Sequence, residues 1–126
     1  MKNKWLDRNL FRSPIYYTVC TSEKILRQEC KRMGIARDKI FISSWSDAST
    51  HFLEAPNKMN AAIVTLFDHK PERELIYALL VHEAVHIWQE IKKLIGEEHP
   101  SKEFEAYSMQ AITQELFVEY QRQVGL

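Results

Sequence analysis

The chain has 126 residues, and its 17 lysines and arginines balance 17 aspartates and glutamates, so its formal net charge is zero. This balance gives no support for a nucleic-acid or membrane-surface partner. Two cysteines do not make a disulfide framework, the N-terminal segment lacks the apolar core of a signal peptide, and no apolar run could span a bilayer. We therefore expect a single cytoplasmic domain over residues 1–126, with residues 1–13 as a loose arm.

The first half of the chain favours strands around one helix. Residues 15–20 are β-branched and aromatic, which is typical of a strand. Thr21 and Ser22 can cap a helix that follows, and Gly34 can end it. Three later segments also have the composition of strands, and the last two flank a turn and suggest a hairpin: Lys39–Ser43, Thr50–Glu54 and Asn60–Phe67.

The second half changes from period two to the helical period of 3.6. Pro71 suits the first position of a helix and Gly96 suits its end, which predicts one helix over residues 71–95. Another is predicted over residues 99–123. The order of elements predicts an α+β fold, in which a small, mostly antiparallel sheet packs on two long C-terminal helices and one N-terminal helix.

The first long helix carries the motif H-E-x-x-H, formed by His82, Glu83 and His86. The spacing of four residues places both imidazoles on one side of the helix, with Glu83 about 100° round from His82. Two such histidines can bind zinc, and the glutamate can act on a zinc-bound water. Apolar neighbours surround the motif, so we expect these side chains to be buried and to need a partner such as a metal ion.

A catalytic zinc site takes a third protein ligand, and two carboxylates follow on the next helix. Glu105 heads an apolar face that continues at Met109, Ile112 and Leu116, where a lone carboxylate is out of place. Glu103 lies on the other side of the first turn, where an acid suits the helix dipole. We therefore choose Glu105 as the third ligand.

The motif, followed by eighteen residues and then Glu105, resembles the H-E-x-x-H-x18-E signature of the gluzincin metallopeptidases. The resemblance implies a minimal zincin-like domain, with His82, His86 and Glu105 as Zn²⁺ ligands and Glu83 as general base. It implies hydrolysis of a peptide or protein substrate, and a strand such as residues 60–67 could form the sheet edge that binds it. The whole pattern also looks like small metallopeptidases encoded by phages and prophages, which would act in the cytoplasm of a bacterium or an infected host cell.

Several points stay open at this stage. Met109 stands where thermolysin-like enzymes place an aspartate that orients a histidine, so the partners of the histidines are unassigned. Mn, Co or Fe could replace zinc with these ligands.

The alternatives to a peptidase are a non-catalytic, zinc-stabilised binding or adaptor domain for a host or phage protein, and a helical scaffold without metal. The sequence does not determine the oligomeric state. Candidate donors to the oxyanion are Tyr77, His51, His69 and His99.

Overall fold

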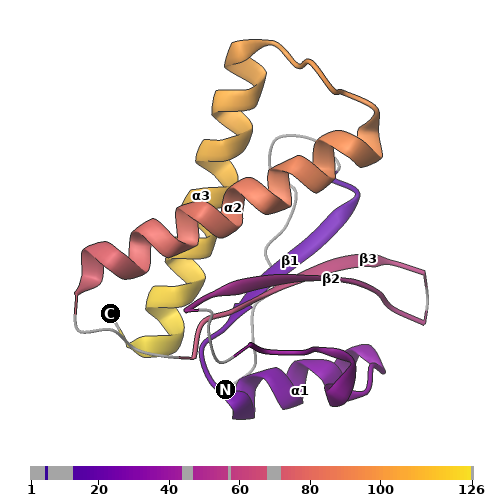
Figure 1. Ribbon diagram of the computed structural model, residues 1–126, viewed down its shortest axis with the longest axis vertical. Helices are drawn as coiled ribbons and strands as arrows, with labels where there is room; N and C mark the ends of the chain where they lie inside the picture. The colour runs from indigo at the N-terminus through magenta and orange to yellow at the C-terminus, as the bar shows by residue number, and fades with distance from the viewer. Residues whose placement is uncertain (1–4, 6–12, 44–46, 57, 68–71, 126) are drawn as a thin grey trace.

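The computed structural model describes residues 5, 13–43, 47–56, 58–67 and 72–125. Within these ranges the chain forms three strands, three α-helices and one short 3-10 helix (Figure 1). In chain order they are β1 (Ile15–Cys20), α1 (Glu23–Met33), the 3-10 helix Arg37–Lys39, β2 (Ser49–Glu54), β3 (Asn60–Thr65), α2 (Arg73–Ile95) and α3 (Lys102–Val124). None of the described helices is both long and apolar enough to cross a membrane.

The three strands form one sheet in the order β1-β3-β2. β2 and β3 are antiparallel, as the hairpin prediction requires, whereas β1 lies parallel to β3. The expectation that residues 60–67 form the sheet edge was wrong, because β3 occupies the centre between two partners. The edge strand on the side of α2 is β2, and this places residues of β2 opposite the H-E-x-x-H motif.

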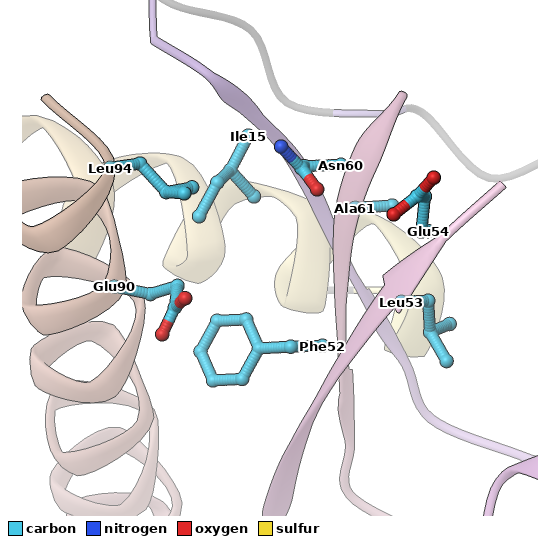
Figure 2. A pocket seen from close by; sticks show the side chains of 8 residues that line it. All are labelled: Ile15, Phe52, Leu53, Glu54, Asn60, Ala61, Glu90 and Leu94. Carbon is cyan, nitrogen blue, oxygen red and sulfur yellow. The ribbon is translucent and has the colours of Figure 1, made fainter. Parts of the chain in front are cut away.

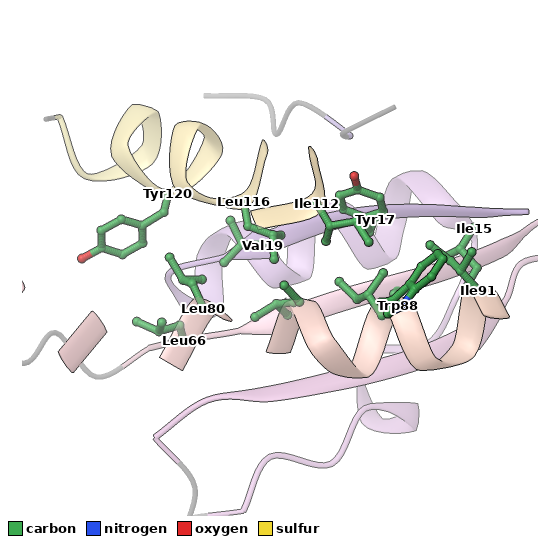
Figure 3. Packing of buried hydrophobic residues seen from close by; sticks show 14 of the residues in the cluster. Ile15, Tyr17, Val19, Leu66, Leu80, Trp88, Ile91, Ile112, Leu116 and Tyr120 are labelled. Atoms are coloured by element: carbon green, nitrogen blue, oxygen red, sulfur yellow. The ribbon is translucent and has the colours of Figure 1, made fainter. Parts of the chain in front are cut away.

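The two long helices cover one face of the sheet, with α3 against β1 and α2 against β2 (Figure 1). Register fixes which side chains point towards them, because successive residues of a strand face opposite sides. Tyr17 pairs with Ala62, and Ala62 with Phe52, so these three share the face under α2 and α3. Figure 3 shows this apolar core, to which α2 contributes a continuous buried stripe: Ile76, Leu80, Ala84, Ile87 and Ile91.

The opposite face of the sheet packs against α1. Ser22 caps that helix by accepting a hydrogen bond from the backbone N–H of Ile25, and Gly34 ends it in the left-handed conformation at φ 74°. Leu26 and Cys30 of α1 pack with Ile63 of β3 in a second, smaller core. The sheet is therefore covered on both faces, and the predicted α+β arrangement of a small sheet packed against helices is confirmed.

The strand predicted over Lys39–Ser43 was wrong, since none of these described residues belongs to a strand. A 3-10 turn uses their backbone instead: the N–H of Ile40 donates to the carbonyl of Arg37 at 3.2 Å. The Arg37 side chain in turn donates to the Ile40 carbonyl at 2.7 Å. Those two bonds use the N–H and the carbonyl of Ile40, which a sheet ladder would otherwise need. The predicted arm over residues 1–13 lies outside the described residues, apart from Trp5 and Ser13.

Candidate metal centre

His82 and His86 come together on the solvent-facing side of α2. Their Nε2 atoms are 3.2 Å apart, and the rings meet edge to face with centroids 4.9 Å apart. The helix produces this pairing directly, because residues four apart lie one above the other. Around a tetrahedral Zn²⁺ with Zn–N bonds of about 2.0–2.1 Å, two ligand nitrogens would lie roughly 3.3–3.4 Å apart. The separation of the pair is close to that of two zinc ligands, and it is also that of a hydrogen bond between the two rings.

Burial of the two histidines was predicted incorrectly. The His82 side chain is 67% exposed, and His86 is exposed as well. The reason is that the sheet and α3 cover α2 from one side only, so the stripe opposite Ala84 and Ile87 faces solvent. The argument that buried imidazoles demand a metal partner therefore does not apply to them. Of the three side chains in the motif, only Glu83 is buried, at 4% exposed, and only its charge needs a partner for that reason.

Glu83 points from α2 towards the edge strand. The hydroxyl of Thr50 on β2 donates a hydrogen bond to its Oε1 at 2.8 Å. Its other oxygen, Oε2, lies 4.0 Å from His82 Nε2. A buried carboxylate needs such a partner to offset its lost hydration. The Thr50 bond thus fixes the carboxylate in an orientation that turns one oxygen towards the histidine pair.

Gln89, one turn further along α2, contacts the ring of His86. Its Oε1 lies 3.2 Å from His86 Nδ1. With the Gln89 oxygen as acceptor, the proton of a neutral His86 ring is on Nδ1 and its Nε2 carries the lone pair. That lone pair accepts from the Nε2–H of His82 in the neutral pair. If both Nε2 atoms bound one metal ion, the His82 proton would have to move to Nδ1, whereas His86 is already in the required form.

Glu105 does not join this group in the structure. Its Oε2 accepts from the indole N–H of Trp88 at 2.9 Å and from the Lys92 ammonium at 3.2 Å. Hydrogen bonds from Trp88 and then Lys92 lower the pKa of the Glu105 carboxyl below its ordinary value, although the side chain is 44% exposed. Trp88 and Lys92 lie on a different side of α2 from His82 and His86, so the carboxylate is directed away from the pair.

The donor set therefore fits a metal ion in part. Two imidazole nitrogens have suitable spacing, and an ionisable carboxylate lies beside them. Among the residues that the structure describes, no group of three or more His, Cys, Asp or Glu side chains is gathered closely enough to hold a metal. For Glu105 to bind the ion shared by the histidines, its contacts with Trp88 and Lys92 would have to break.

The candidate oxyanion donors lie elsewhere. The Tyr77 hydroxyl accepts from Gln121 of α3 at 2.7 Å, which ties it to the helix pair. His51 Nε2 lies 3.0 Å from the Thr65 hydroxyl on the α1 side of the sheet, where burial lowers its pKa and favours the neutral ring. His99 lies in the exposed α2–α3 loop, and His69 falls outside the described residues.

Thr50 and Gln89 were not predicted from the sequence as site residues. Gln89 could have been found, since it follows His86 by three residues on the same helix. Thr50 could not, because its proximity to Glu83 depends on how β2 packs against α2.

No protein-family model matches the chain, and the searches of curated proteins and of solved structures likewise returned no match.

Proposed function

We propose that the protein is a zinc-dependent metallopeptidase, in which His82 and His86 bind the metal and Glu83 is the general base. The observation that carries this proposal is the 3.2 Å separation of the two Nε2 atoms, which suits two ligands of one tetrahedral ion. The position of Glu83 supports it, because its Oε2 faces the pair at 4.0 Å, near enough to reach a water held there.

Each side chain has a distinct part in this proposal. A bound zinc ion lowers the pKa of its water to about 7 and polarises the scissile carbonyl. Glu83 would act as general base through Oε2, accepting a proton from the attacking water and returning it to the leaving amine. Thr50 holds the carboxylate in place through Oε1, at 2.8 Å. Gln89 keeps the His86 proton on Nδ1, at 3.2 Å, so that Nε2 is available to a metal.

A peptide substrate suits the edge strand beside this site. In the described part of the chain β2 pairs only with β3, so its outer backbone groups are available for an extended peptide. Thr50 of that strand already contacts Glu83. A peptide paired along β2 would therefore pass close to the histidine pair.

The wild-type protein tests the proposal directly. Zinc titration by calorimetry should give saturable binding with one ion per chain, and the zinc-loaded protein should cleave an unfolded protein such as casein. A chelator should abolish cleavage, and added Zn²⁺ should restore it. Saturable zinc binding without cleavage would favour the zinc-stabilised binding domain instead. Failure to bind zinc would overturn both proposals.

Glu105 is proposed as the third ligand. Its replacement by alanine tests whether it binds zinc or only joins α3 to α2 through Trp88 and Lys92. A ligand should lower zinc affinity by more than about a hundredfold when removed, beyond the 10–100-fold typical of outer-shell partners. Calorimetry on Glu105→Ala measures this, with Glu103→Ala as the matched control on the exposed side of the same turn. Unchanged affinity with a lower melting temperature would instead assign Glu105 to joining α3 with α2 through Trp88 and Lys92.

A further inference from the structure

A pocket lies between β2 and the C-terminal half of α2. The pocket has a volume of about 210 Å³ and is lined by eight residues (Figure 2): Ile15, Phe52, Leu53, Glu54, Asn60, Ala61, Glu90 and Leu94. It is smaller than the roughly 300–1,000 Å³ of pockets that enclose whole small molecules. Its size therefore suits a single side chain of a larger ligand.

The pocket is aligned with the candidate centre on both of its walls. Phe52 follows Thr50 by two residues on β2, so both side chains lie on the face towards α2. Glu90 follows Glu83 by seven residues on α2, which is two turns on the same side of the helix. Phe52 and Glu90 thus lie on the same faces of β2 and α2 as Thr50 and Glu83 do.

The pocket lining is mostly apolar but carries two acidic side chains, Glu54 from β2 and Glu90 from α2. Figure 2 shows Phe52 and Glu90 directed towards one another across the gap, with Leu94 and Ile15 nearer its upper end. Phe52 is 43% exposed, and the Glu90 side chain is 29% exposed, so both are accessible to a ligand. Glu90 has a lysine within reach on its own helix, Lys93, but their contact is long at 3.9 Å and the lysine is 78% exposed. Such surface pairs contribute little, so Glu90 can exchange partners.

We propose that this pocket binds a lysine or arginine side chain of the substrate, with Glu90 as the specificity-determining residue. A basic side chain has an apolar stem and a charged end, which match the apolar Phe52 and Leu94 and the Glu90 carboxylate. This inference rests on the proposed function in that it takes the ligand to be a peptide lying along β2.

The geometry also predicts where the basic residue lies in the substrate. Seven residues of helix from Glu83 to Glu90 span about 10 Å. On β2, Phe52 lies two residues from Thr50, and an extended peptide rises about 3.3 Å per residue, so the pocket lies roughly two to three residues from the carbonyl beside Glu83. We expect a preference for Lys or Arg at that distance on one side of the cleaved bond.

Two measurements keep this inference separate from the proposed function. The first is cleavage of a mixed peptide library by the zinc-loaded wild type, followed by sequencing of the products. The second is binding of two fluorescent decapeptides, one with a central lysine and one with norleucine there, to Glu83→Gln, which removes the proposed base. Each is repeated with Glu90→Gln added, and with Glu98→Gln added as a control at an exposed acid beyond the end of α2.

We expect the wild type to prefer Lys or Arg about tenfold and Glu90→Gln to lose that preference, while Glu98→Gln retains it. Glu90→Lys should reverse the preference towards acidic residues. Cleavage without a basic preference, or a preference unaffected by Glu90→Gln, overturns the inference and leaves the peptidase standing. Selective binding of the lysine peptide without any cleavage supports the pocket and overturns the peptidase. Equal binding of both peptides without cleavage overturns both.

Discussion

Replacing His82 and His86 together with alanine should abolish saturable zinc binding, and each single replacement should weaken it by more than about a hundredfold. The pair supplies both nitrogens whose 3.2 Å separation suits a shared ion, and either single replacement leaves one imidazole beside the Glu83 carboxylate. The fold should remain, because both side chains are exposed and exposed substitutions usually change stability by only about 0.5 kcal/mol or less. Calorimetric zinc titration measures the affinity of each variant.

Thermal unfolding gives a second measurement of the same prediction. Zinc at a hundred times its dissociation constant should stabilise the wild type by about 2.7 kcal/mol, and the double variant should lose this shift. His99→Ala is the matched control, since that histidine lies in the exposed α2–α3 loop. If the double variant bound zinc as tightly as the wild type, the assignment of the histidine pair would be wrong.

The sequence predicted those parts of the fold that depend on local signals. Ile15–Cys20 is the predicted strand without change, and the glycines that end α1 and α2 were identified from their positions after apolar periods. The strand predicted over Lys39–Ser43 was wrong because its composition suits a strand, while a 3-10 turn and the Arg37 side chain bind the backbone of its first two residues. Likewise, nothing local shows that β3 is central, since that depends on β1 pairing with a segment about forty residues away.

The features of the candidate site that depend on local geometry were also the ones that the sequence predicted. The pairing of His82 with His86 follows from helix geometry alone and was predicted. The exposure of that pair was not, because apolar neighbours such as Val81 and Val85 do not reveal which side of α2 the sheet covers. The direction of Glu105 depends on how α3 crosses α2, and the side chains of Trp88 and Lys92 determine its contacts. Inter-helix geometry of this kind cannot be read from the spacing between two motifs.

Glu83→Gln should lower the rate of peptide cleavage by about 10²–10⁴-fold while zinc affinity stays within a few fold of the wild type. Glutamine has nearly the same shape and keeps a carbonyl oxygen that can accept from Thr50, so the buried position stays filled and hydrogen-bonded. What it lacks is a basic oxygen on the side facing His82. Steady-state kinetics on the zinc-loaded variant, with a melting curve to verify folding, measures the loss.

Thr50→Val tests the hydrogen bond that orients the Glu83 carboxylate, without removing the carboxylate itself. It removes the hydrogen bond that orients Oε1 but leaves the carboxylate able to take a proton. We expect a smaller fall in rate, of about tenfold, because the carboxylate would sample orientations that turn Oε2 away from the pair. A Glu83→Gln protein that binds zinc and cleaves at the wild-type rate would remove Glu83 from the reaction. If Thr50→Val were slower than Glu83→Gln, the hydroxyl of Thr50 would have to act on the substrate directly, because its only role in this proposal is to hold Glu83.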